Sequence, residues 1–164
     1  MNAHLLAFAA VTDVLQRYLD GLHLSDTVLL RTVFHPKAVY ATAAAGAPLV
    51  LHMDEYFPIV DRRPSPASKG ETREDRILGI DFIGPDLVVA RLECAILPRH
   101  FVDVLTLILA DGRWQIVSKV FRTASFSCRP ACSHRPSTAG TPVPAESPTG
   151  SGNSHRAPST PPAS

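Results

Sequence analysis

The sequence predicts an α+β domain over residues 1–123, followed by a disordered tail over residues 124–164. Three observations carry this prediction. The chain opens with an amphipathic helical pattern, its middle holds a run of alternating strand patterns, and its last part is dominated by Pro, Ser, Thr, Gly and Ala. Helices segregated from antiparallel strands are typical of α+β domains. A segment almost without aliphatic residues cannot bury enough apolar surface to offset its ordering entropy.

The first element is an amphipathic helix. Its apolar stripe steps by three and four residues along Leu5, Phe8, Thr12, Leu15, Leu19 and Leu22. Gly21 is a plausible C-terminal stop. Ser25 or Asp26 can cap a second, shorter helix, which ends near Phe34 because a residue before proline, here His35, disfavours helical backbone.

The next elements are short. The sequence predicts strands over 37–44 and 49–52, a helix over 54–60 and a loop over 62–71. Four longer strands or strand segments follow, over 74–83, 87–97, 100–110 and 113–122, joined by turn signals such as Asp111-Gly112. Strict alternation places Leu78, Ile80 and Phe82 on one face of the first of these strands. In the last strand it separates Trp114, Ile116 and Val120 from Val117, Lys119 and Phe121.

Composition and charge exclude several classes of protein. The net charge is +1; the tail holds three arginines and one glutamate, which leaves about −1 for residues 1–123, so no basic patch indicates nucleic-acid binding. The N-terminus resembles neither a signal peptide nor a membrane span, and one cysteine in the domain suits a reducing compartment, so we expect a cytoplasmic protein. No spacing predicts a metal site, and no fingerprint predicts a cofactor.

Three segments resemble the nuclear transport factor 2-like superfamily. They are YLDGLHLSD from Tyr18 to Asp26, VFHPKAVY from Val33 to Tyr40, and FVDVLTLILADGRWQIVSKVF from Phe101 to Phe121. The resemblance covers nearly all of residues 5–123 and is strongest to the lumazine-binding-like branch, in a group that also holds ketosteroid isomerases, scytalone dehydratase and polyketide cyclases. It implies a strongly curved sheet around helices, a cone with an internal pocket, and dimers that form through the outer sheet face.

Asp103 is the main candidate for chemistry. It shares a strand face with Phe101 and Leu105, and a carboxylate on an apolar face is costly unless it is paired. It could act as a general base or acid, or it could be a structural group held by hydrogen bonds. The resemblance places His35 near the pocket mouth, as a partner for Asp103 or a ligand donor; otherwise it is a histidine that ends a helix.

Five further residues are candidates for ligand binding. Lys119 could pair with an acid or an anionic ligand, or be a solvated strand lysine. The aromatic candidates, which combine an apolar body with a polar tip or are simply core, are Tyr18, Tyr40, Tyr56 and Trp114.

Two functional hypotheses follow from the sequence. The first is a pocket domain that binds a small molecule and is a homodimer. The alternative is a cofactor-independent lyase or isomerase, of the dehydratase, ketosteroid-isomerase or polyketide-cyclase type, with Asp103 as the general base or acid and His35 assisting. A buried acid–histidine pair that solvent can reach would favour the enzyme. A pocket closed by the core, or an Asp103 fully occupied by structural bonds, would favour the binding domain.

Overall fold

The computed structural model describes residues 3–43 and 46–124. Its helices are α1 (Ala3–Leu24), α2 (Thr27–Val33) and α3 (Met53–Arg62), with a 3-10 turn η1 (Ala67–Lys69). Its strands are β1 (Phe34–Thr42), β2 (Leu49–His52), β3 (Asp75–Phe82), β4 (Leu87–Ile96), β5 (Arg99–Ala110) and β6 (Arg113–Ala124). Residues 125–164 of the predicted tail, and Ala44 at the end of a predicted strand, lie outside the described residues.

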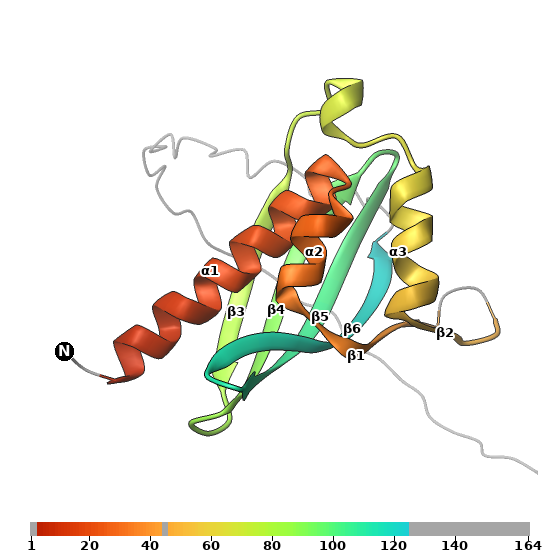
Figure 1. The fold of residues 1–164 in the computed structure, drawn as a ribbon. Helices are drawn as coiled ribbons and strands as arrows, with labels where there is room; N and C mark the ends of the chain where they lie inside the picture. The colour runs from red at the N-terminus through yellow and green to blue at the C-terminus, as the bar shows by residue number, and fades with distance from the viewer. Residues whose placement is uncertain (1–2, 44–45, 125–164) are drawn as a thin grey trace, which may run out of the picture. The chain divides into compact units, whose positions relative to one another are not determined.

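The six strands form one curved sheet in the order β2-β1-β6-β5-β4-β3. β1 and β6 pair in parallel, and every other neighbouring pair is antiparallel. The helices pack on one face of this sheet (Figure 1). The predicted α+β class is therefore confirmed. Within residues 3–43 and 46–124, none of the helices has the length and apolar character that a membrane-spanning helix requires.

The buried face of α1 lies in its C-terminal two thirds. Leu15, Leu19 and Leu22 of the predicted stripe are buried, together with Val11, Val14 and Tyr18. The prediction that the N-terminal part of this stripe packs on the core is wrong, because Leu5 is 62% exposed and Phe8 is 46% exposed.

Gly21 has a different role from the one its sequence position suggests. It lies inside α1, which continues to Leu24, and a Cβ built on it would come within 2.6 Å of the side chain of Leu30. Its missing side chain therefore lets α2 approach α1 closely. The residue that leaves the helix with a positive φ is Ser25, and Asp26 then caps α2 by accepting a hydrogen bond from the Leu29 amide. The second helix ends at Val33, slightly before the expected boundary.

Two register shifts change which residues face the core. In β3, Ile77 pairs with Leu92 and Gly79 pairs with Arg91, so Leu78 is left without a partner and is 41% exposed. Ile77 packs against the core in its place. The prediction that Leu78 shares a face with Ile80 and Phe82 is therefore wrong, because an extra residue in one strand reverses the alternation.

The second shift occurs in β6 and positions the candidate site. Ile116 pairs with Leu107 and Ser118 pairs with Thr106, which leaves Val117 without a partner in β5. Trp114 and Ile116 therefore share the buried face with Lys119, whereas Val120 is 48% exposed. Strict alternation predicted instead that Val120 shares the face of Trp114 and Ile116 and that Lys119 lies on the other face.

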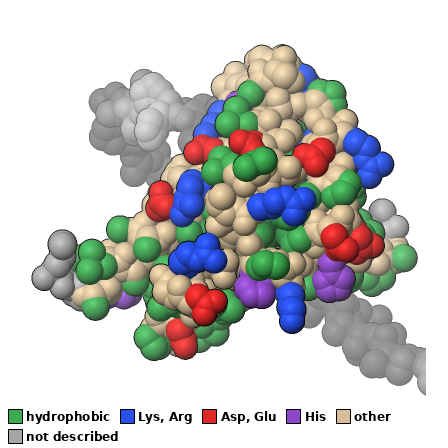
Figure 2. Space-filling model, viewed as in Figure 1, with side chains coloured by type: hydrophobic (Ala, Val, Ile, Leu, Met, Phe, Trp, Pro, Cys, Tyr) green, Lys and Arg blue, Asp and Glu red, His purple; other side chains and the backbone are tan. Residues whose placement is uncertain are grey.

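The surface carries charges of both signs. On the face drawn in Figure 2, acidic and basic side chains lie among one another without a large area of one sign. Several are paired, including Arg73 with Asp20 at 2.5 Å and Arg76 with Glu93 at 2.6 Å. Exposed pairs of this kind contribute little to stability.

Candidate functional site

A buried polar network connects α1 to β5 and β6. The Lys119 ammonium lies 2.9 Å from Asp103 Oδ2 and donates a hydrogen bond to Tyr18 Oη at 2.5 Å. Tyr18 Oη in turn donates to the same Asp103 oxygen at 2.6 Å. Both Tyr18 and Asp103 are fully buried, and Lys119 is 4% exposed. The Tyr18 hydroxyl thus contacts two residues that are distant in the sequence, Asp103 at 85 positions and Lys119 at 101 positions.

Asp103 receives a further contact from the neighbouring strand. The Cys94 thiol of β4 lies 3.6 Å from Asp103 Oδ2, so three donors converge on one carboxylate oxygen. The other oxygen, Oδ1, is buried and has no hydrogen-bond partner among the described residues. The network therefore leaves one acceptor of Asp103 unused.

Aromatic rings enclose the Lys119 ammonium. Its Nζ lies 5.2 Å from the centroid of the Tyr18 ring, 5.4 Å from that of Phe121 and 5.9 Å from that of Tyr40. These distances are within the range of cation–π attraction, which adds to the ion pair in a desolvated position. Lys119 is thus held as a cation from several sides.

The electrostatics of the network favour fixed protonation states. Burial by itself lowers the pKa of Lys119, but the neighbouring Asp103 carboxylate more than offsets this, and the net pKa is raised. Burial, followed by the charge of Asp103, raises the pKa of Tyr18 well above its ordinary value and that of Cys94 to about 12. At neutral pH these three groups therefore keep their protons and act as hydrogen-bond donors.

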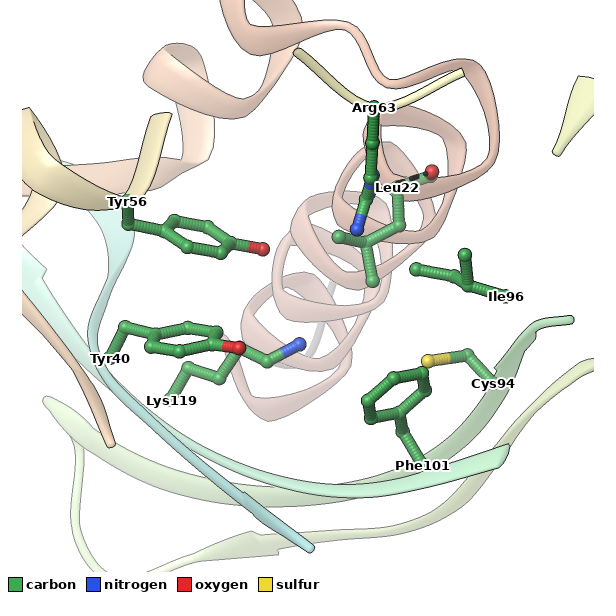
Figure 3. Close-up of a pocket in the computed structure, with 8 residues that line it drawn as sticks. All are labelled: Leu22, Tyr40, Tyr56, Arg63, Cys94, Ile96, Phe101 and Lys119. Carbon is green, nitrogen blue, oxygen red and sulfur yellow. Dashed lines mark hydrogen bonds between the residues drawn. The ribbon is translucent and has the colours of Figure 1, made fainter. Parts of the chain in front are cut away.

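A cavity lies beside this network, partly open to solvent. It leaves about 40 Å³ for the centres of water-sized molecules, which is room for a few waters or for part of a compact ligand. Figure 3 shows its lining, which comes from α1, β1, α3 and the residue that follows it, β4, β5 and β6. The residues are Leu22, Tyr40, Tyr56, Arg63, Cys94, Ile96, Phe101 and Lys119.

Two tyrosine hydroxyls point into the cavity (Figure 3). The rings of Tyr40 and Tyr56 stack with their centroids 4.3 Å apart and an interplanar angle of 21°. Burial raises the pKa of Tyr40 to about 12 and also raises the pKa of Tyr56. Within the described part of the chain, neither hydroxyl has a hydrogen-bond partner. Both are therefore neutral groups that can donate to a bound molecule.

Arg63 borders the same cavity. It follows α3, donates from Nε to Ser25 Oγ at 3.1 Å and from Nη2 to the Leu22 carbonyl oxygen at 3.2 Å. These bonds connect the end of α3 to the end of α1. Figure 3 shows the guanidinium reaching toward the space that the tyrosine hydroxyls face.

The predicted site residues separate into distinct environments. Tyr40, Tyr56 and Lys119 line the cavity, whereas Asp103 and Tyr18 form the buried network beside it. Trp114 does not line this cavity.

Trp114 packs instead in the core, edge-to-face with Phe82 at 6.0 Å between centroids. The expected pairing of His35 with Asp103 is wrong. The His35 Nδ1 accepts a hydrogen bond from the Lys37 amide at 3.1 Å, and the polar contacts of Asp103 come from Tyr18, Lys119 and Cys94.

Sequence reasoning missed Arg63 and Cys94 as lining residues. Arg63 falls in the predicted loop over residues 62–71, and nothing in the local sequence indicates its contact with Leu22 on a distant helix. Cys94 lies on the buried face of β4, and the alternation of apolar residues along that strand is a signal that could have indicated its position. Within the residues that the structure describes, no group of three His, Cys, Asp or Glu side chains could hold a metal ion.

The fold resembles several solved structures. A nuclear transport factor 2-like protein of unknown function from Shewanella baltica has a TM-score of 0.68 and 22% identity, over 77% of this chain and all of that one. A ketosteroid isomerase-like protein from Erwinia carotovora atroseptica has a TM-score of 0.56 and 13% identity, over 71% of this chain and 95% of that one. Hexachlorocyclohexane dehydrochlorinase LinA-type3 from Novosphingobium barchaimii has a TM-score of 0.55 and 15% identity, over 76% of this chain and 91% of that one. At these identities the likeness shows the fold.

Sequence comparison gives the family. A comparison with curated proteins gives no significant match. The profile of the family described as "Putative lumazine-binding" matches residues 7–122, which include every strand residue that builds the network and the cavity. This chain therefore belongs to the family of that description, and it has the fold of the nuclear transport factor 2-like proteins.

Proposed function

We propose that the domain binds a compact small molecule through hydrogen-bond acceptor oxygens that meet the donors of the cavity. The observation that carries this proposal is the pair of hydroxyls on Tyr40 and Tyr56, which face the cavity without a hydrogen-bond partner among the described residues. Buried or half-buried polar groups are normally satisfied, so an unsatisfied pair at a cavity indicates a place for water or ligand.

The cavity offers donors and an apolar surface together. Its polar groups are the tyrosine hydroxyls, the Arg63 guanidinium and the Lys119 ammonium, and its apolar lining includes Ile96 and Phe101. A planar ring with carbonyl oxygens complements both kinds of surface. The family description names such a molecule, lumazine, and we infer that a ring of this kind occupies the cavity.

The test is ligand-induced stabilisation with a matched pair of variants. Lumazine and single-ring compounds that carry carbonyl oxygens are screened by thermal unfolding, because a ligand that binds only the native state raises its melting temperature. Replacing Tyr56 and Tyr40 by Phe keeps the rings and removes the hydroxyls, so we expect affinity to fall by about 5- to 30-fold for each lost hydrogen bond. Unchanged affinity in the double variant would overturn the proposal.

The enzymatic alternative requires Asp103 to meet a substrate. Three donors already contact its Oδ2, and Asp103 is not among the residues that line the cavity, which supports the binding domain over the lyase or isomerase. Its unpartnered Oδ1 is the one feature that favours the alternative. Asp103→Asn would then abolish turnover of any substrate that the screen identifies, by about 10²- to 10⁴-fold. A turnover that survives this substitution would exclude Asp103 as the base.

We also propose that the domain forms a homodimer through the outer face of its sheet. Val104 of β5 and Val120 of β6 pair with one another and are 37% and 48% exposed on that face. Adjacent exposed valines on an open sheet form an apolar surface that a second copy can cover. We expect light scattering at micromolar concentration to report a dimer and the Val104→Glu variant to be a monomer. A monomeric wild-type domain would exclude this assembly.

A further inference from the structure

We propose that Arg63 makes the cavity selective for a small organic anion, whose carboxylate or enolate oxygen it receives. This inference rests on the proposed function and specifies the charge of the ligand. It follows from the position of Arg63, from its hydrogen bonds and from the balance of charge around the cavity.

Arg63 is held in place by hydrogen bonds, but most of its N–H donors remain unused. Its side chain is half-buried, and its two hydrogen bonds go to neutral oxygens, Ser25 Oγ and the Leu22 carbonyl. A guanidinium carries five N–H donors, so about three remain for another partner. The bonds to α1 orient the group in advance, which lowers the entropic cost of receiving an anion.

No carboxylate within the described residues forms an ion pair with Arg63. By contrast, Arg17, Arg73 and Arg76 on the surface each contact an acidic side chain. A cation that is partly removed from water is costly without a counter-charge. The cavity wall therefore holds a cation whose natural complement is missing from the residues that the structure describes.

The second cation of the cavity is already neutralised. Lys119 pairs with Asp103 at 2.9 Å, so its charge is matched inside the protein. Tyr40, Tyr56 and Cys94 keep their protons at neutral pH, because burial raises the pKa of each. The lining thus has one unmatched positive charge, on Arg63, flanked by neutral donors.

The ligand class follows from these groups taken together. A carboxylate can accept two parallel N–H bonds from a guanidinium, and its second oxygen can reach a tyrosine hydroxyl. The attached ring would lie against Tyr40 and Phe101, whose faces border the same space. A compact aromatic or heteroaromatic acid satisfies all of these contacts, whereas a cation of the same size would meet repulsion from Arg63.

The experiment compares acids with neutral amides of nearly the same shape. The probes are benzoate with benzamide, nicotinate with nicotinamide, and orotate with orotamide, each titrated by calorimetry or by thermal shift into the full chain. We expect the acids to bind wild type about 10- to 100-fold more tightly than their amides, since a hydrogen bond to a charged partner is about twice as strong as a neutral one.

Variants then assign the charge selectivity to one residue. Arg63→Gln should remove the preference for acids, while Arg63→Lys should restore part of it. The matched control is Arg62→Gln, since Arg62 is the exposed neighbour that bonds to the Pro58 carbonyl and does not line the cavity. Because the measured quantity is the ratio of acid to amide affinity within each variant, a change in stability does not imitate the result.

Four outcomes would overturn the inference. Equal binding of acids and amides to wild type would exclude charge selectivity, while leaving the proposed binding function in place. An acid preference that survives in Arg63→Gln, or that disappears in Arg62→Gln, would assign the selectivity to another group. Failure of every acid to bind at millimolar concentration would exclude an anionic ligand, even if neutral carbonyl compounds bind in the hydroxyl-removal test.

Discussion

The buried network and the adjacent cavity use the same kinds of side chain for different ends. In the network, Tyr18 gives its hydroxyl to Asp103, and Lys119 is matched by the same carboxylate. In the cavity, Tyr56 has a hydroxyl with no partner among the described residues, and Arg63 has no counter-charge there. Residue type therefore does not decide the role of a side chain. The role depends on whether the fold has already supplied a partner.

The largest expected effect comes from breaking the ion pair of the network. Lys119→Met leaves the Asp103 carboxylate buried without its counter-charge, so the free energy of unfolding should fall by about 3–5 kcal/mol. Urea unfolding measures this, with Lys37→Met on the exposed part of β1 as the control. Adding Asp103→Leu to Lys119→Met should recover part of the loss, because it removes the orphaned charge. Additive losses in the double variant would contradict this account of the network.

A matched pair of tyrosine variants sharpens the comparison. Tyr18→Phe removes a hydroxyl that donates to Asp103 and accepts from Lys119, so we expect a loss of about 1–3 kcal/mol in the free energy of unfolding. Tyr56→Phe removes a hydroxyl without such bonds, so its unfolding free energy should change by less than about 0.5 kcal/mol. Similar losses in both variants would show that the cavity hydroxyl also stabilises the fold.

A separate effect is expected at alkaline pH, where the stability of the fold should decline. Burial and the Asp103 charge raise the pKa of Cys94 from 9.0 to about 12, so the unfolded chain loses this proton first as pH rises. The contribution is fully present below pH 9.0 and is lost as pH approaches about 12. Urea midpoints measured across this range should fall, and Cys94→Ala should flatten the curve between these limits. An unchanged slope in the variant would show that other groups dominate.

The sequence predicted the strands and the inward position of Asp103, because alternation over a long strand such as β5 is a strong local signal. It assigned Lys119 to the face opposite Trp114 and Ile116, since strict alternation cannot reveal the extra residue at Val117. Of the two partners that it offered for Asp103, Lys119 is confirmed and His35 is wrong. It did not predict the contact with Tyr18, which lies 85 positions away on a helix. Contacts of that range depend on how α1 crosses the sheet, which local patterns do not encode.

The unpaired residue in β6 has a consequence for insertions and deletions. On either side of Val117 the ladder with β5 is regular, with Ile116 opposite Leu107 and Ser118 opposite Thr106. Removing Val117 would join two strand segments whose side chains already alternate in register with β5. Lys119 would therefore still oppose Leu105 and point inward. Removing Ser118 instead would place Val117 opposite Thr106 and leave the inward orientation of Lys119 unchanged. A chain one residue shorter at this point can therefore keep the whole network, whereas a substitution at Lys119 cannot.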